Sequence, residues 1–343
     1  MVNLKFGQYL ADRATQKFAE CIRIIKFFAP FLIANLMSEP LLNYALCPDA
    51  ADGHRMAYWQ WGQPGSAHVV LCVHGLTRQG RDFDVLARAL CSGAGQAGAG
   101  GIRVICADVV GRGESDWLKD PMGYQIPAYA ADMLTLLAQL HAESPIATLD
   151  WVGTSMGGLI GMVVCGQPDL PLPVPVRRLV LNDVGPALEW QAIQRIGAYL
   201  GQAGHFSSVQ EAADAMEIIS RSFGPHTKEQ WLALSRPMVK PVTRAADSLL
   251  RLHYDPAIAV PFKLTDQATA QEGEATLWQL YDSIKAETLL VRGALSDLLS
   301  PETAEAMARR GPGARLVEFE GVGHAPTLIA NDQVAAVTAF LLA

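Results

Sequence analysis

Residues Gly153-Thr154-Ser155-Met156-Gly157-Gly158 place a serine between closely spaced glycines. This stretch follows an apolar run over residues 148–152 and precedes a second apolar run over residues 159–164, which has the length and flanks of a helix. This pattern predicts a strand, a tight turn and a helix. In a G-x-S-x-G elbow the serine sits on a strained turn, and the glycines two residues before and after it let the strand and helix pack closely. We therefore expect Ser155 to be a nucleophile held at the end of a strand.

Strands and helices alternate on both sides of this elbow. Strand patterns occupy residues 68–73, 102–107, 178–183 and 288–293. The first of them is apolar on both faces, as a central strand covered by helices must be. Helical patterns occupy residues 84–90, 127–142 and 302–310. This order predicts an α/β fold with a mostly parallel, doubly wound sheet of eight strands. Its active site should lie at the carboxyl ends of the strands.

The alternation stops after Gly185-Pro186, where a helical insertion rich in large apolar residues begins. We expect a helical cap over residues 187–275, inserted after the sixth strand. The predicted core then covers residues 47–186 and 276–343, and an extension covers residues 1–46. An insertion at this edge of the sheet should lie over the elbow. Four residues are candidates for lining an apolar substrate pocket beneath it: Trp190, Trp231, Trp278 and Leu298.

The extension contains an amphipathic helical pattern over residues 17–37 that bends at Pro30. Its apolar part, residues 27–37, is shorter than the ~20 residues that span a bilayer. We expect this helix to cover an apolar surface of the protein itself or to contact a second copy of the chain. A membrane surface is the alternative.

The composition limits the function classes. The chain has 343 residues, half of them hydrophobic, and a formal net charge of −7, which does not suggest a nucleic-acid partner. Its six cysteines form no C-x-x-C pair, so free thiols and a cytoplasmic location are expected, with membrane association through the N-terminal helix as a variant. No cluster has metal-ligand spacing, and we expect neither a metal nor a cofactor.

A serine nucleophile needs a base, and the base needs a carboxylate to orient it. His324 follows the last predicted strand, and Asp297 follows the strand before it. We expect His324 to be the base and Asp297 the orienting acid, because the order Ser, Asp, His fits this kind of site. Asp183, at the end of the strand before the insertion, is the competing candidate for the acid.

From about residue 50 to its end the chain resembles an α/β-hydrolase with a helical cap, of the serine esterase or lipase type. The matching pieces are His74-Gly75, Asp108-x-x-Gly111-x-Gly113-x-Ser115, Gly153-x-Ser155-x-Gly157, Asp297 and His324. The resemblance implies an oxyanion hole formed by the backbone N–H groups of Leu76 and Met156. The first 46 residues have no counterpart in this pattern.

Three polar residues near these motifs have structural interpretations. We expect His74 to brace the backbone beside the oxyanion loop. Arg78 and Arg112 are expected to form ion pairs with nearby aspartates, with a bound substrate carboxylate as the alternative.

The predicted function is a serine hydrolase that cleaves carboxylic esters with an apolar portion through an acyl-enzyme. Hydrolysis of lactones or carbon–carbon bonds and acyl transfer use the same machinery and remain open alternatives. A ligand-binding protein without turnover is a further alternative, which an intact serine, acid and histidine disfavour. A serine at the elbow argues against dehalogenase and epoxide hydrolase chemistry, where an aspartate stands in that position.

Overall fold

The computed structural model describes residues 39–49, 52–96, 101–202, 204–242 and 249–343. The predicted helix over residues 17–37 lies outside these described residues, as does the contact expected of it. Within the described residues, no helix has both the length and the hydrophobicity needed to cross a bilayer.

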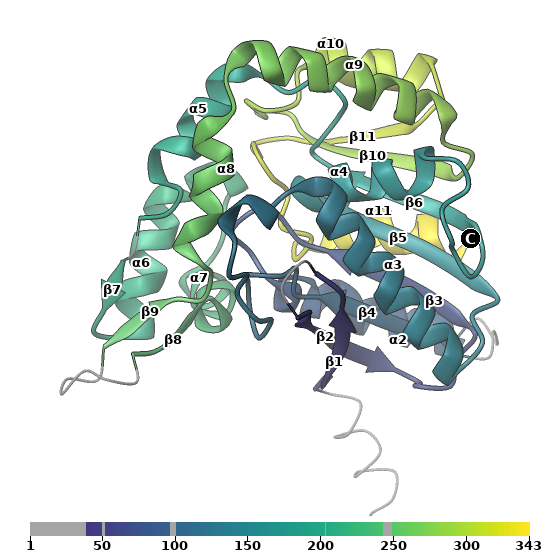
Figure 1. Cartoon of the computed structure of the whole chain (residues 1–343), viewed down its shortest axis with the longest axis horizontal. Coiled ribbons are helices and arrows are strands. Elements are labelled where there is room, and N and C mark those ends of the chain that lie inside the picture. Colours follow the sequence, from purple (N-terminus) through teal and green to yellow (C-terminus); the bar gives the residue numbers. More distant parts are fainter. Residues whose placement is uncertain (1–38, 50–51, 97–100, 203, 243–248) are drawn as a thin grey trace, which may run out of the picture. The chain divides into compact units, whose positions relative to one another are not determined.

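Residues 41–343 form one compact unit built on an eight-stranded sheet (Figure 1). The strands are β1 (Leu41–Cys47), β2 (His54–Gly62), β3 (His68–Val73), β4 (Arg103–Ala107), β5 (Thr148–Thr154), β6 (Val176–Asn182), β10 (Glu287–Gly293) and β11 (Arg315–Phe319). Their order is β1-β2-β4-β3-β5-β6-β10-β11. Only β2 runs antiparallel to its neighbours β1 and β4. The predicted mostly parallel sheet of eight strands is therefore confirmed.

Helices cover both faces of this sheet, which explains why its central strands are apolar on both sides. They are α2 (Asp84–Gln96), α3 (Ile126–Glu143), α4 (Met156–Gly166), α9 (Gln267–Ser283), α10 (Pro301–Arg309) and α11 (Asn331–Leu342). Side chains of α2 and α11 share one core cluster with the sheet, and those of α3, α4, α9 and α10 share the other. In Figure 1, α3 and α4 lie in front of the sheet and α11 lies behind it.

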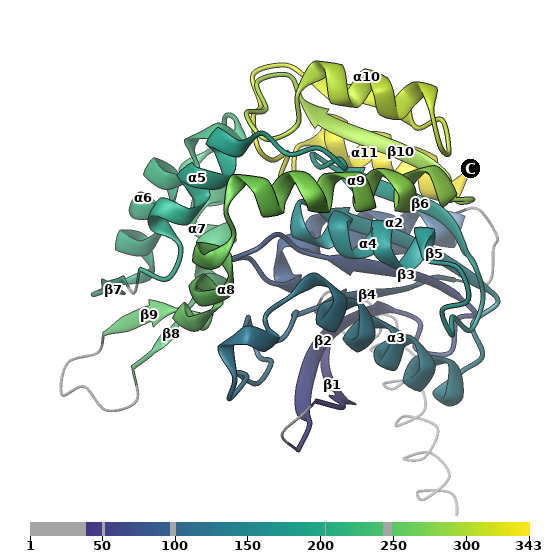
Figure 2. The same cartoon turned by 45° about the horizontal axis from the view of Figure 1, so that its top comes forward.

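The insertion after β6 forms a separate layer next to the large sheet (Figure 2). It contains α5 (Trp190–Tyr199), α6 (Val209–Ile219), α7 (Lys228–Ser235) and α8 (Ala259–Leu264). It also contains a small antiparallel sheet of β7 (His205–Phe206), β9 (Leu250–Leu252) and β8 (Val239–Pro241), which the sequence patterns did not predict. Side-chain caps begin two of these helices: Ser208 caps α6, and Thr227 and Gln230 form a capping box at α7. A cap of this kind contributes about 1 kcal/mol.

Two of the predicted domain boundaries are wrong. Residues 41–46 belong to the core, because β1 pairs with β2 along its whole length. The cap also ends earlier than residue 275, because α9 begins at Gln267 and packs along α4 of the core. The predicted boundary at residue 275 lies inside α9. This helix is largely polar at its start, so the sequence pattern did not show where it begins.

Candidate active site

The elbow between β5 and α4 has the strained geometry expected from its sequence. Ser155 has φ 51° and ψ −116°, a left-handed backbone conformation that costs energy for a residue with a side chain. A Cβ atom on Gly157 would lie 1.9 Å from the carbonyl oxygen of Val73, and one on Gly153 would lie 2.3 Å from the carbonyl oxygen of Gly157. Only glycine fits at these two positions, and the close packing holds Ser155 at the carboxyl end of β5.

The imidazole of His324 connects Ser155 to Asp183. Its Nε2 atom lies 3.0 Å from Ser155 Oγ, and its Nδ1 atom lies 2.8 Å from Asp183 Oδ2. The Asp183 side chain is fully buried and also accepts hydrogen bonds from the Gly293 backbone N–H and the Ser296 hydroxyl. Because a buried carboxylate accepts the Nδ1 proton, Nε2 is free to accept the hydroxyl proton of Ser155.

Asp297 does not take part in this chain of hydrogen bonds, so the prediction that it orients His324 is wrong. Its carboxylate is 46% exposed and forms a two-pronged ion pair with Arg195 of the cap helix α5, at 2.7 and 2.9 Å. The loop that carries it turns back at Ser296, whose N–H donates to the Gly293 carbonyl. Ser296 therefore faces Asp183 while the next residue faces the cap.

The loop that carries His324 is held by the cap and by β6. The hydroxyl of Ser222 in the cap donates to the His324 carbonyl at 2.8 Å. The backbone carbonyl of Ser222 accepts the Gly323 N–H at 2.6 Å. Asn182 donates to the Pro326 carbonyl and to the Thr154 hydroxyl. Ser222 could not be predicted from sequence, since it lies 102 residues before His324 in a segment without a motif.

The two predicted oxyanion donors flank Ser155. Leu76 and Met156 line the same cavity as Ser155, and a Cβ atom on Gly75 would lie 3.7 Å from the Ser155 Cβ. Met156 is the first residue of α4, where a helix leaves its N–H groups without acceptors of its own. Both N–H groups therefore come from segments that border Ser155.

His74 braces this loop, as expected. It is fully buried, with Nδ1 2.7 Å from the Gly75 carbonyl and Nε2 2.9 Å from the Val109 N–H. These contacts define a neutral tautomer, because Nδ1 must donate and Nε2 must accept. Burial lowers the pKa of His74 to about 3, against the effect of the Gly75 hydrogen bond, and the positive charge of Arg112 lowers it further.

The two arginines near this loop differ. Arg78 forms the expected ion pair with Asp82, at 2.6 Å. The prediction that Arg112 forms an ion pair is wrong. Its guanidinium is fully buried and donates to the carbonyl oxygens of Leu76 and Val110 and to the Tyr129 hydroxyl. Arg112 therefore fixes the carbonyl side of the oxyanion loop, a role that its sequence neighbours do not indicate.

Comparison with known proteins shows the family to which this chain belongs. A family model described as the alpha/beta hydrolase family matches residues 70–337. The chain belongs to the alpha/beta hydrolase family. This confirms the family resemblance and the fold class that its motifs predict.

Several members of the alpha/beta hydrolase family are similar to this chain over most of its length. A 3-hydroxybutyrate-oligomer hydrolase from Cupriavidus necator is 46% identical over 305 residues, which cover 89% of this chain and 99% of the relative. The structure of an alpha/beta hydrolase from Novosphingobium aromaticivorans is 34% identical, with a TM-score of 0.72, and covers 89% of this chain and 99% of that one. The structure of a putative hydrolase from Rickettsia typhi is 27% identical, with a TM-score of 0.75, and the match covers 88% of this chain and 99% of that one.

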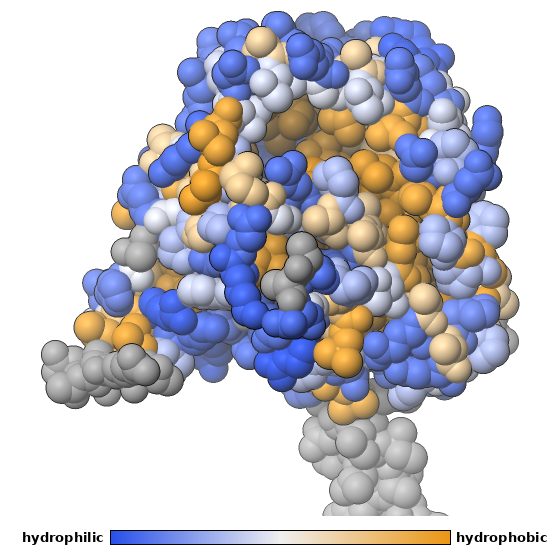
Figure 3. Space-filling view, in the orientation of Figure 1, coloured by the Kyte–Doolittle hydropathy of each residue, from blue (hydrophilic) through white to orange (hydrophobic). Residues whose placement is uncertain are grey.

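As in the capped hydrolase that the sequence predicts, a cavity lies between Ser155 and the insertion. Its volume is about 940 Å³. Its walls come from the segment at residues 122–125 and the start of α3, from α5, from α8 and from the start of α9. In the space-filling view, hydrophobic residues gather in a hollow beneath α9 (Figure 3). Among its lining residues in the described part of the chain, the only charged side chains are Glu189 and Glu274. The cavity therefore favours an uncharged, largely apolar ligand.

Two of the four predicted pocket residues line this cavity. Trp190 and Leu298 do so, whereas Trp231 and Trp278 do not. Trp231 is 4% exposed and packs within the cap against Phe223, with ring centroids 6.3 Å apart. Trp278 lies on α9 with its ring edge-on to Tyr281, and the Arg310 guanidinium covers it. These two aromatic residues stabilise packing inside the protein, and Leu277, beside Trp278, faces the cavity instead.

Proposed function

We propose that this protein is a serine hydrolase that cleaves carboxylic esters with an apolar portion, with Ser155 as nucleophile, His324 as base and Asp183 as orienting acid. The observation that carries the proposal is the continuous hydrogen-bonded chain from Ser155 Oγ through His324 to a fully buried Asp183. A serine without such a base is a poor nucleophile at neutral pH. The family membership of the chain supports the same chemistry.

In the first half of the reaction, His324 Nε2 takes the hydroxyl proton as Ser155 Oγ attacks the ester carbonyl carbon. Asp183 keeps the imidazole oriented and stabilises the imidazolium that forms. The backbone N–H groups of Leu76 and Met156 donate to the carbonyl oxygen as it becomes negatively charged. Each such donor contributes about 3 kcal/mol in comparable sites. Collapse of the intermediate breaks the carbon–oxygen bond, and His324 gives its proton to the leaving alkoxide.

In the second half, His324 Nε2 takes a proton from water, and the resulting hydroxide attacks the acyl carbon. The same two N–H groups stabilise the second intermediate. The acid product leaves when the carbon–oxygen bond to Ser155 breaks and His324 returns the proton to Oγ. No group outside the three residues, the two N–H donors and water is required.

For the substrate, we infer short oligoesters of 3-hydroxy acids. The relative from Cupriavidus necator is named for hydrolysis of 3-hydroxybutyrate oligomers, and 46% identity over nearly its full length supports a similar substrate here. The inner ester units of such oligomers are uncharged, which suits a cavity whose only charged lining side chains, within the described residues, are carboxylates. We expect the free carboxylate end of the oligomer to stay outside the cavity, because Glu189 and Glu274 repel it.

This substrate assignment is tested by incubating the protein with the dimer and the trimer of 3-hydroxybutyrate and following release of the free acid by chromatography. We expect release from both, with none above background from a Ser155→Ala variant. Hydrolysis of simple aryl esters without any release from the oligomers would retain ester hydrolysis and reject the oligomer substrate.

The apolar cavity predicts a dependence of activity on acyl chain length. Each additional CH₂ group that becomes buried contributes up to about 0.8 kcal/mol, or about fourfold in kcat/KM. For aryl esters of straight-chain acids we expect kcat/KM to rise over the first few carbons and to fall once the cavity is filled. A flat profile would contradict the assignment of this cavity to the substrate.

A pair of tryptophan variants tests which aromatic residues contact the substrate. Trp190→Ala removes a wall of the cavity, so we expect a higher KM and a loss of discrimination between medium and long acyl chains. Trp278→Ala makes the same change outside the cavity, and we expect a lower melting temperature with the chain-length profile unchanged. Steady-state kinetics and thermal unfolding of both variants provide the comparison. A changed profile in Trp278→Ala with a normal one in Trp190→Ala would reverse the assignment.

A further inference from the structure

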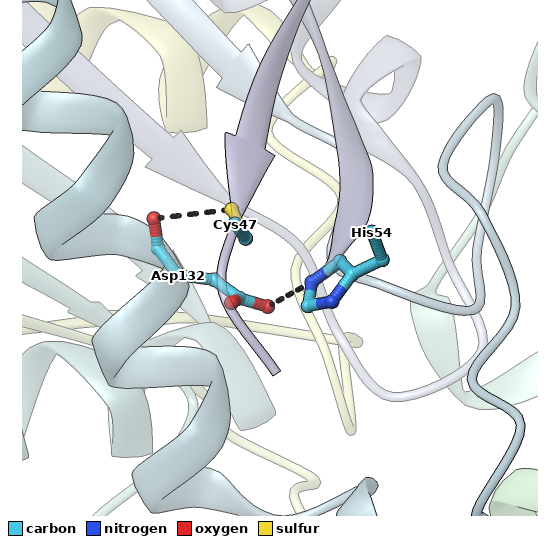
Figure 4. Close-up of side chains that lie close together, drawn as sticks. All are labelled: Cys47, His54 and Asp132. Carbon is cyan, nitrogen blue, oxygen red and sulfur yellow. Dashed lines mark hydrogen bonds and ion pairs between the residues drawn. The ribbon is translucent and has the colours of Figure 1, made fainter. Parts of the chain in front are cut away.

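A second group of reactive side chains lies at the edge of the sheet where β1 and β2 meet α3. Cys47 ends β1, His54 begins β2 and Asp132 lies within α3 (Figure 4). The three residues are 2%, 9% and 3% exposed, and one ligand atom from each lies within 4.8 Å of the other two. None of them lines the cavity that contains Ser155.

The histidine in this group is held in a definite orientation. His54 Nε2 lies 3.0 Å from Asp132 Oδ2, and Nδ1 lies 3.2 Å from Asp49 Oδ2. The other oxygen of Asp49 accepts the backbone N–H groups of Asp52 and Gly53. Histidines that bind metal ions usually donate their second ring N–H to a carboxylate in this way, which fixes the tautomer and the ring. Asp49 thus holds the ring so that Nε2 is directed toward the Asp132 carboxylate.

We propose that Cys47 Sγ, His54 Nε2 and the Asp132 carboxylate bind a divalent transition-metal ion of the zinc class, with water as the fourth ligand. Thiolate, imidazole and carboxylate are the ligand types that zinc binds. Tetrahedral ligand atoms at 2.0–2.3 Å from the ion stand about 3.3–3.8 Å apart. The group needs only a contraction of about 1 Å at its longest separation to reach this geometry.

A purely structural ion-pair cluster is the alternative interpretation. It requires both ring nitrogens of His54 to carry protons, so that an imidazolium pairs with two carboxylates. Cys47 then contributes only a weak contact, from Sγ to the Asp132 carbonyl oxygen at 3.9 Å. A metal ion instead uses all three side chains. A thiolate ligand favours Zn²⁺ and Co²⁺ over Mg²⁺, which prefers oxygen ligands.

The position of this site suggests a link between three segments. A bound ion would connect the end of β1 and the start of β2 to α3. Helix α3 also carries Tyr129, whose hydroxyl accepts a hydrogen bond from Arg112 beneath the oxyanion loop. The ligands come from positions 47, 54 and 132, so metal-ligand spacing in the sequence could not indicate them.

The test is a titration of the full-length, chelator-treated protein with Co²⁺. We expect a saturable thiolate-to-cobalt absorption band in the near ultraviolet, one ion per chain, and its loss on addition of Zn²⁺. Cys47→Ser should remove the band, whereas Cys91→Ser, at a partly buried free thiol elsewhere, should retain it. Asp49→Asn should weaken binding by about 10–100-fold, as loss of a carboxylate behind a histidine ligand does. Asp52→Asn, in the same turn, is its control.

The wild-type protein alone can overturn the proposal, so it does not depend on the folding of any variant. Absence of a saturable charge-transfer band would leave only the ion-pair cluster. A band that persists in folded Cys47→Ser would place the ion elsewhere. X-ray absorption of the zinc-loaded wild-type protein should show one sulfur at about 2.3 Å and nitrogen or oxygen ligands at about 2.0 Å. A shell without sulfur would also reject this site.

Discussion

Replacing Ser155 with alanine is expected to lower kcat for ester hydrolysis by about 10⁶-fold, because loss of the nucleophile disables the whole set of three residues. The backbone strain at Ser155 and the close contacts of Gly153 and Gly157 do not depend on the hydroxyl group. We therefore expect folding and the melting temperature to be retained. Steady-state kinetics with a short-chain aryl ester and thermal unfolding measure the two effects.

Ser283→Ala is the matched control for this prediction. Its hydroxyl lies on the exposed side of α9 and donates to the Gln279 carbonyl of its own helix. We expect wild-type kinetics from this variant. If Ser155→Ala kept a tenth of the wild-type activity in a preparation free of other esterases, another residue would have to be the nucleophile.

The second large effect is expected at Asp183. Asp183→Asn should lower kcat by about 10⁴-fold, as the same change does in serine proteases, since an amide in place of the carboxylate favours the wrong tautomer of the catalytic histidine. Asn has nearly the same size as Asp, and its oxygen can still accept the N–H of Gly293, which bonds to Oδ1 in the wild-type protein. The amide nitrogen then stands where Oδ2 accepts from Ser296 and His324. The measurement is kcat across a range of pH, with unfolding curves as a check on stability.

Asp297→Asn is the matched comparison for Asp183→Asn. It weakens only the exposed ion pair to Arg195, and such pairs typically contribute less than about 1 kcal/mol to stability. We expect its kcat to stay within a few-fold of the wild-type value. The reverse ranking of the two variants would return the role of the acid to Asp297.

The elbow and the base could be predicted from the sequence because each depends on local rules. Gly153 and Gly157 are required by contacts of the elbow with its own strand and helix and with β3. His324 follows the last strand of the sheet, so its position depends only on the order of the strands. The elbow and the base can each be recognised in a short stretch of sequence, and the structure brings Ser155 and His324 together.

The acid could not be chosen in this way. Asp183 and Asp297 both follow strands that neighbour each other in the sheet, and both satisfy the order Ser, Asp, His. The choice depends on a single turn after β10, which directs Ser296 toward Asp183 and Asp297 toward the cap. The side chain that pairs with Asp297 is Arg195, 102 residues earlier in the chain, so no local pattern could reveal it.

The prediction of the pocket residues was wrong for Trp231 and Trp278 for a similar reason. Large aromatic residues mark both the lining of a cavity and the internal packing of a small layer of helices. Trp190 and Trp231 lie on different short helices, α5 and α7, and only tertiary packing decides which ring faces Ser155. The short strands of the cap were missed because segments of two or three residues have no detectable alternation.

The central claim is that Ser155 is a nucleophile activated by His324 and Asp183. Its most direct test is to react the protein with a fluorophosphonate and to locate the adduct by peptide mass spectrometry while ester hydrolysis is followed in parallel. We predict one phosphonyl group per chain, attached to Ser155, formed at the same rate as activity is lost and at a greatly reduced rate in Asp183→Asn. Loss of activity with the label on another residue, or full activity with Ser155 labelled, would contradict the claim.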